Sequence, residues 1–204
     1  MKNVYIVTHA ESIHHVEDLG GGWYDTSLTA NGITQANNIA KALYNLIKIP
    51  EIPVYSSDLK RAAETADIIS RIFNSKVIYD RRLREMSYGE AEGKPRKWRE
   101  QNIIPKPIDG DRLNHRIFNN SESRRDIGIR IQDCFNQIIS KPDENIIIIT
   151  HGFALTFIIM TWLKVPVENM NYSNFQTAPG RVTHLYEDDA FESRNIVYIS
   201  KAMT

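Results

Sequence analysis

Two histidines each come directly after a short β-rich run, a position from which a side chain can reach a ligand. His9 follows the run at residues 3–8, and His151 follows the run at residues 145–150. Arg61 lies just inside a predicted helix start, where free backbone N–H groups and the helix dipole favour anions. Its guanidinium carries a fork of donors that suits phosphate oxygens. These residue types in these positions predict a site that handles a phosphoryl group.

An acidic segment adds a group that can transfer protons. Glu85 lies in the sequence Leu-Arg-Glu-Met-Ser-Tyr-Gly-Glu-Ala-Glu-Gly, close to a glycine-rich turn, and is a candidate general acid. Ligands of an open parallel sheet bind beyond the carboxyl ends of its strands. Because the segments that carry His9, Arg61 and His151 all follow predicted strands, we expect these side chains to share one pocket.

Short β-rich runs alternate with longer stretches of helical periodicity. Strands are predicted at residues 3–8, 53–57, 76–80, 145–150, 182–187 and 195–200. One helix is predicted at residues 31–47, a second begins with Asp58 as its N-cap, and a third covers about residues 124–139. The periodicity of the three helices predicts their buried positions, which are Ile33, Ala36, Ala40, Leu43 and Ile47, then Ala62, Ala66, Ile69 and Phe73, then Ile127, Ile131, Phe135 and Ile138.

Strands that alternate with helices imply βαβ units, and hence an α/β fold with a mainly parallel sheet covered by helices on both faces. The apolar run at residues 145–150 supports this fold, since a central parallel strand is buried on both faces. We expect a single domain over residues 1–204, because no linker is long or polar enough to separate two. Residues 94–120 contain several prolines and no clean period, which predicts an irregular, lid-like insertion over the pocket.

Composition limits the partners and the compartment. The 25 basic and 25 acidic residues cancel, so no sequence-wide field attracts nucleic acid or an anionic membrane. Residues 146–163 are apolar, but they contain His151 and Gly152 and are better explained by a strand, a turn and a core helix. The single cysteine, Cys134, lies in a helical pattern and is expected to be buried and inert. We expect a cytoplasmic protein, and the sequence is compatible with a homodimer.

Several segments, in order along the chain, resemble the histidine phosphatase superfamily, also called the phosphoglycerate mutase-like family. They are Thr8-His9-Ala10-Glu11, the stretch from Trp23 to Ala36, the segment around Arg61, the segment from Leu83 to Gly93, Ser121-Glu122-Ser123 and Thr150-His151-Gly152. The resemblance implies a three-layer sandwich and a transiently phosphorylated His9. It also implies that Arg61 and His151 hold the phosphoryl oxygens, that Glu85 exchanges protons with the leaving oxygen and water, and that no metal or other cofactor is needed.

The chain departs from the family pattern beside the nucleophile. Thr8 replaces an arginine, Ala10 replaces a glycine, and His15 falls where the family has an asparagine that contacts phosphate. We expect Thr8, Ala10, His15 and Gly152 to border the phosphate. Either His14 or His15 compensates for the missing arginine, partly as an imidazolium, or the activity is weakened. The survival of the other site residues favours an active variant.

Three alternatives stay open at this point. A metal site built from His9, Glu11, His14 and His15 has no helical spacing to support it. A domain without activity would bind a phosphorylated ligand. A mutase would need extra basic residues over the site, and Arg96, Lys97 and Arg99 are available for that role. The segment Glu-Ala-Glu-Gly-Lys-Pro-Arg-Lys-Trp is more similar to the phosphatase form, so we expect hydrolysis of a small phosphorylated metabolite.

Overall fold

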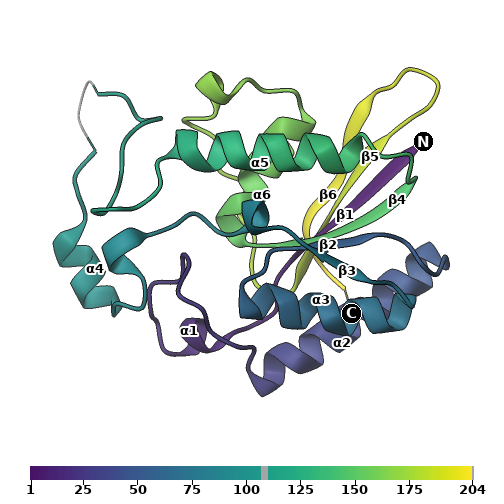
Figure 1. Cartoon of the computed structure of the whole chain (residues 1–204), viewed down its shortest axis with the longest axis horizontal. Helices are drawn as coiled ribbons and strands as arrows, with labels where there is room; N and C mark the ends of the chain where they lie inside the picture. The colour runs from purple at the N-terminus through teal and green to yellow at the C-terminus, as the bar shows by residue number, and fades with distance from the viewer. Residues whose placement is uncertain (107–109, 204) are drawn as a thin grey trace.

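The computed structural model describes residues 1–106 and 110–203, and its six strands form one sheet (Figure 1). In the sheet order β3-β2-β4-β1-β5-β6, the strands are Val77–Tyr79, Val54–Ser56, Asn145–Thr150, Lys2–Thr8, Arg181–Glu187 and Arg194–Ala202. The first four of these are parallel, whereas β5 and β6 are two antiparallel strands at one edge. The predicted mainly parallel α/β sheet is therefore confirmed.

Helices cover both faces of the sheet (Figure 1). α2 (Ala30–Ile47) and α3 (Lys60–Phe73) lie on one face, and α5 (Arg124–Ile139) and α6 (Gly152–Trp162) lie on the other. The central strand β4 serves both layers, because successive side chains of a strand point to opposite faces. Its isoleucines are all buried, and they alternate between the two hydrophobic clusters. β4 is followed by a turn and the buried helix α6, as the sequence predicted.

The predicted N-cap of the second helix is wrong. α3 begins at Lys60, and its N-cap is Leu59, which offers no side-chain oxygen. The Asp58 carboxylate instead accepts two hydrogen bonds of 2.6 Å from the Arg84 guanidinium. Asp25, from a distant loop, accepts the Lys60 backbone N–H at 2.7 Å. A tertiary contact therefore does the capping that the local sequence assigned to Asp58.

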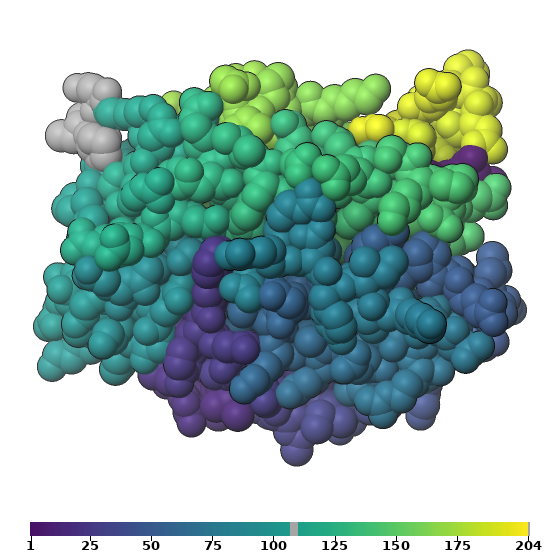
Figure 2. Space-filling view, in the orientation of Figure 1, coloured from purple at the N-terminus to yellow at the C-terminus, as the bar shows by residue number. Residues whose placement is uncertain are grey.

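Two further expectations need correction. Ile33 is 48% exposed, because it borders a surface groove between α2 and α3 instead of the sheet. The insertion at residues 94–120 is not wholly irregular, since it contains the helix α4 (Arg96–Asn102). The Gly20 N–H donates to the Lys94 carbonyl at 2.9 Å, and in Figure 2 the teal insertion lies against the purple segment that follows β1. Residues 107–109 of the insertion lie outside the described residues.

The remaining predicted positions of the three helices are buried, except that Ile47 is only partly buried. Cys134 is fully buried in α5, and burial raises the pKa of its thiol to about 12, with the nearby Asp80 carboxylate adding to the effect. Its predicted inertness fits this environment, since the thiolate is the reactive form.

Over residues 1–106 and 110–203, no helix has both the length and the apolar character needed to cross a membrane.

The two isoleucines of α5 at positions 129 and 131 test the buried face of this helix. Ile131 is fully buried, whereas Ile129 is 53% exposed. We expect Ile131→Ala to lower the free energy of unfolding by about 2–5 kcal/mol, because it leaves a cavity in a packed core. The matched control Ile129→Ala is expected to change it by no more than about 0.5 kcal/mol. Urea unfolding followed by circular dichroism measures both values, and equal losses would contradict this orientation of α5.

Candidate active site

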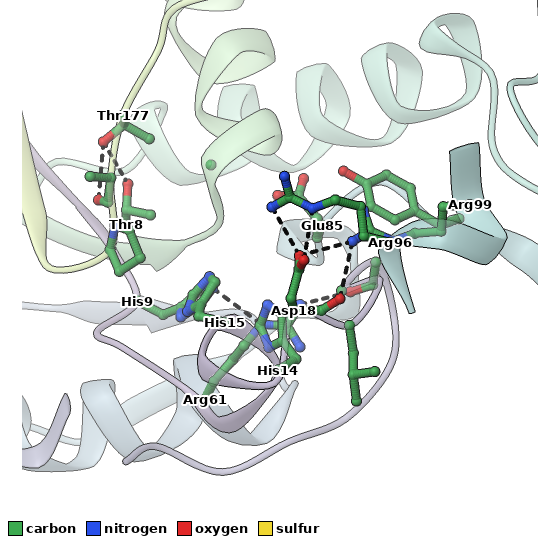
Figure 3. A pocket seen from close by; sticks show the side chains of 17 residues that line it. Thr8, His9, His14, His15, Asp18, Arg61, Glu85, Arg96, Arg99 and Thr177 are labelled. Atoms are coloured by element: carbon green, nitrogen blue, oxygen red, sulfur yellow. Dashed lines mark hydrogen bonds and ion pairs between the residues drawn. The ribbon is translucent and has the colours of Figure 1, made fainter. Parts of the chain in front are cut away.

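The carboxyl ends of β1 and β4 lie at a cavity of about 420 Å³ (Figure 3). Six residues predicted for the site line it, namely Thr8, His9, His15, Arg61, Glu85 and Gly152. Arg96 and Arg99 of α4 also line this cavity, so the insertion borders the pocket as expected. The structure therefore brings together residues from six separate segments of the chain.

The backbone around His9 fixes which ring nitrogen is free. The His9 N–H donates to the Thr150 carbonyl at 2.9 Å, which extends the pairing of β1 with β4. His9 Nδ1 lies 2.8 Å from the Ala10 carbonyl and must donate to it, so in the neutral ring Nε2 is unprotonated. Ala10 itself is fully buried, and its N–H donates to Thr65 Oγ1 at 3.2 Å. Ala10 thus orients the nucleophile candidate from behind the cavity.

The charge state of His9 follows from its surroundings. Burial, together with the Arg61 guanidinium and the neighbouring His15, holds the pKa of His9 well below 6.5. The Arg61 Nε–H donates to His9 Nε2 over 3.2 Å. A neutral imidazole with its lone pair on Nε2 is the form that can attack phosphorus, once the Arg61 Nε–H passes to an oxygen of the incoming group.

Arg61 is only 1% exposed, and hydrogen bonds to backbone carbonyls hold its guanidinium in place. Its Nη1 donates to the Tyr24 carbonyl at 2.8 Å, and its Nη2 donates to the Gly22 carbonyl at 2.7 Å. The Glu92 carboxylate holds this loop in turn, because it accepts the backbone N–H of Trp23 at 3.0 Å. Gly22 has a φ of +52°, a conformation that favours glycine. The loop after β1 therefore sets the direction in which the guanidinium points.

His151 is fully buried just behind the cavity, with its ring centroid 5.0 Å from that of His9. Its Nε2 lies 2.8 Å from Ser57 Oγ, and its Nδ1 has no hydrogen-bond partner in the described part of the chain. Burial and the positive charge of Arg61 hold the pKa of His151 well below 6.5. A buried polar atom without a partner marks a place where a ligand atom can bind.

His14 and His15, the two adjacent histidines that follow His9 in the chain, have different surroundings. The ring of His15 is stacked on that of His9 at a centroid distance of 5.3 Å, and its Nδ1 accepts the Ser12 N–H at 3.2 Å. His14 Nδ1 lies 3.0 Å from both Ser12 Oγ and Thr26 Oγ1, so this ring is tied into the loop. His15 is exposed at the cavity and is the better placed of the two to meet a phosphoryl oxygen.

The surroundings of His14 and His15 disfavour their charged forms. Burial, His15 and Arg61 lower the pKa of His14 to about 3. Although His15 is exposed at the cavity, its pKa is also lowered, chiefly by partial desolvation of the ring and then by Arg61, while Glu11 opposes the shift. These shifts favour neutral rings at neutral pH, and compensation by an imidazolium beside bound phosphate stays a prediction.

Glu85 is buried at the N-terminus of α6, where three backbone N–H groups converge on its carboxylate. Oε1 accepts from Met86 at 2.9 Å and from Ala154 at 3.0 Å, and Oε2 accepts from Phe153 at 3.0 Å. Burial raises the pKa of Glu85, although these N–H donors and Arg61 oppose the increase. A carboxyl group with a raised pKa can serve both as a proton donor and as a proton acceptor.

Arg130 positions the segment that carries Glu85, and no motif in the sequence pointed to it. Its Nη1 donates to the carbonyls of Arg82 and Arg84 at 2.7 Å, and its Nη2 donates to the carbonyl of Glu85 at 2.8 Å. Glu122 pairs with the same guanidinium at 2.7 Å. The Ser-Glu-Ser element therefore acts through Arg130 on the backbone of Glu85.

Two more lining residues were not identified from the sequence. Asp18 binds Arg96 with an N–O distance of 2.7 Å and Arg99 with one of 3.2 Å, so it joins α4 to the loop after β1. Thr177, from the loop before β5, places its Oγ1 3.3 Å from Thr8 Oγ1. Lys97, which the sequence offered as a third basic residue, does not contribute to the lining.

The metal alternative is not supported by the arrangement of the side chains. Within the described residues, no group of three or more His, Cys, Asp or Glu side chains is arranged to hold a metal ion. Glu11, which that alternative required, accepts a hydrogen bond from Thr29 Oγ1 at 2.6 Å.

The sequence and the fold are similar to those of several known proteins. Residues 4–196 match the model of the histidine phosphatase superfamily (branch 1). "Putative phosphoserine phosphatase 2" from Hydrogenobacter thermophilus is 29% identical, over 98% of this chain and 96% of its own. "Probable phosphoglycerate mutase GpmB" from Proteus mirabilis is 32% identical, over 81% of this chain and 77% of its own. The crystal structure of the alpha-ribazole phosphatase from Shigella flexneri superposes with a TM-score of 0.80 at 22% identity, covering 98% of this chain and 96% of that one.

The match covers nearly all of the chain and includes every motif on which the resemblance was based. The superposed structure shares the fold that the strand and helix pattern predicted. This protein belongs to the histidine phosphatase superfamily.

Proposed function

We propose that this protein is a phosphatase that hydrolyses a small phosphomonoester through a phosphohistidine at His9. The observation that carries this proposal is the hydrogen bonding of His9, whose Nδ1 donates to the Ala10 carbonyl, so that the lone pair lies on Nε2, where it meets the Arg61 Nε–H at the cavity. Burial and the positive charge of Arg61 keep the ring neutral, as a nucleophile requires. The phosphatase names of relatives in the same superfamily support the same reaction.

In the first step, His9 Nε2 attacks phosphorus and the bond between phosphorus and the leaving oxygen breaks. The entering phosphoryl group takes over the Arg61 Nε–H, which contacts His9 Nε2 in the empty cavity. The unpartnered Nδ1 of His151 is a second donor for the phosphoryl oxygens. These groups stabilise charge on the oxygens without moving, because Arg61 and His151 are already held by other contacts.

Glu85 supplies and recovers the proton. Its carboxyl group protonates the leaving oxygen in the first step, and the carboxylate takes a proton from the attacking water in the second. Water then forms a bond to phosphorus while the bond from phosphorus to His9 Nε2 breaks, which releases inorganic phosphate. Burial raises the pKa of Glu85, whereas three backbone N–H groups stabilise its charged form, and these opposing effects suit a group that both gives and takes a proton.

A mutase is a second candidate, because Arg96 and Arg99 line the cavity and one relative bears a mutase name. A mutase would use such residues to retain and reorient a phosphorylated acid. In this structure Asp18 pairs with both arginines and offsets part of their charge. This contact favours hydrolysis as the main reaction.

The first prediction concerns the covalent intermediate. Brief incubation with a ³²P-labelled aryl phosphate, followed by a denaturing quench, should leave label that survives alkali and is lost in acid, as expected for phosphohistidine. His9→Ala should abolish both the label and hydrolysis. His184→Ala is the matched control, because His184 lies in β5 and outside the cavity lining. An acid-stable label, or label retained by His9→Ala, would contradict the role of His9.

The second prediction concerns the proton donor. Glu85→Gln should slow hydrolysis of an alkyl phosphate by about 10²–10⁴-fold, a typical value for general acid help. It should slow nitrophenyl phosphate much less, because nitrophenolate leaves without protonation. Glu90→Gln is the control, since Glu90 is exposed in the same segment. Equal losses on the two substrates would show that Glu85 only shapes the pocket.

The third prediction separates the phosphatase from its alternatives. Phosphoserine, alpha-ribazole phosphate and 3-phosphoglycerate, chosen from the names of the relatives, are incubated with the purified protein and followed by ³¹P NMR. We expect inorganic phosphate as the main product from at least one of them, at a rate that a metal chelator does not change. A positional isomer of phosphoglycerate as the main product would establish a mutase. Binding without turnover of any ester would establish a ligand-binding domain.

A further inference from the structure

The hydroxyl of Thr8 occupies a protected position at the inner side of the cavity. Thr8 is buried at the end of β1, and its Oγ1 lies 3.3 Å from Oγ1 of Thr177. Thr177 Oγ1 also reaches the Ala178 carbonyl at 3.4 Å and can only donate to it. Thr177 then accepts from Thr8, which leaves the lone pairs of Thr8 Oγ1 available as acceptors. Figure 3 shows the two threonines together, well away from Asp18 and Arg96.

Permanent positive charge is scarce next to these hydroxyls. Of the arginines that line the cavity, Arg61 is almost fully buried, whereas the side chains of Arg96 and Arg99 are 66% and 25% exposed and both pair with Asp18. The four imidazoles around Arg61 have lowered pKa values and are neutral near pH 7, namely His9, His14, His15 and His151.

The acidic groups that face the same space are Glu85 and Tyr88. Burial raises the pKa of both, so the phenol of Tyr88 stays neutral and only Glu85 can add a negative charge. One guanidinium and one carboxyl group thus set the charge of the inner cavity. A phosphoryl dianion bound there would leave at least one buried negative charge without a partner, which is unfavourable.

We propose that this cavity selects the phosphoryl group as its monoanion, with the P–O–H hydrogen donated to Thr8 Oγ1. The proposal rests on the proposed phosphatase function and adds the ionic form of the substrate class. A monoanion matches the single charge of Arg61, and its P–O–H needs an acceptor that an arginine at position 8 would lack. Thr8 is therefore a specificity-determining residue, and Thr177 is a positioning residue that sets the direction of the Thr8 hydroxyl.

Inorganic phosphate and sulfate are suitable probes, because phosphate changes from monoanion to dianion near neutral pH whereas sulfate remains a dianion. Calorimetric titration of the purified protein between pH 5.5 and 8.5 measures both dissociation constants without any turnover. Protonation of the protein groups named above affects the binding of both anions in the same direction. The ratio of the two dissociation constants therefore reports the charge of phosphate itself.

For the unaltered protein, we expect phosphate to bind at least tenfold more tightly than sulfate at pH 5.5. This advantage should fall by about tenfold for each pH unit above the second ionisation of phosphate, as the monoanion becomes scarce. Thr8→Arg should tighten sulfate binding at least tenfold and remove the pH dependence of the ratio, because it supplies a second cation and no acceptor.

Two further variants separate the hydroxyl from the charge. Thr8→Val keeps the shape of the side chain and should reduce the advantage of phosphate at pH 5.5 without tightening sulfate. Thr177→Val should have the same effect to a smaller degree. Thr161→Val is the matched control, since Thr161 is a buried threonine of α6 whose hydroxyl has no partner among the described residues and lies outside the cavity lining.

The outcomes distinguish this proposal from the phosphatase proposal. Equal binding of the two anions at every pH, together with intact hydrolysis through His9, would overturn monoanion selection alone. An unchanged ratio in both Thr8→Val and Thr8→Arg would likewise exclude Thr8 as its source. Monoanion-selective binding in a protein that hydrolyses no ester would support the selection and overturn the phosphatase. Failure of both anions to bind at millimolar concentration would overturn monoanion selection, whereas the phosphatase proposal is decided by hydrolysis itself.

Discussion

The buried guanidinium of Arg61 is the interaction on which the rest of the site depends. An arginine that is 1% exposed must satisfy its donors within the protein. The carbonyls of Gly22 and Tyr24 accept from it, and His9 Nε2 accepts from Nε. Burial lowers the pKa values of the surrounding imidazoles, His9 and His151 included, and the positive charge of Arg61 lowers them further. One buried cation thereby both attracts an anion and maintains the nucleophile in its reactive form.

The fold and the main site residues could be predicted because they depend on local patterns. A fully apolar strand, helical periodicity and histidines at strand ends are visible in the sequence, and parallel strands bring their carboxyl ends to one edge. His9, Arg61 and Glu85 therefore line one cavity in the structure, as expected. The roles assigned to them stay predictions, since geometry shows proximity and not turnover.

The features that could not be predicted all depend on long-range contacts. Asp58 has the local signature of an N-cap, but Arg84 binds it and Asp25 contacts the helix start instead. Arg130 acts on backbone carbonyls, which leave no mark in the sequence. The charge of His15 depends on burial and on Arg61, which is 46 positions away along the chain. A sequence shows residue types, but partners across the fold decide their protonation.

The position of Glu85 shows how the fold tunes a single carboxyl group for two opposite tasks. Burial alone would keep the group protonated, which suits a donor but prevents it from accepting a proton. Three backbone N–H groups, two of them at the start of α6, stabilise the carboxylate and counteract burial. The same helix follows His151. The segment from β4 to α6 therefore fixes both the position of His151, a hydrogen-bond donor to phosphate, and the pKa of Glu85. A shift of α6 relative to β4 would therefore disturb both at once, and the burial of α6 from Ala154 to Trp162 opposes such a shift.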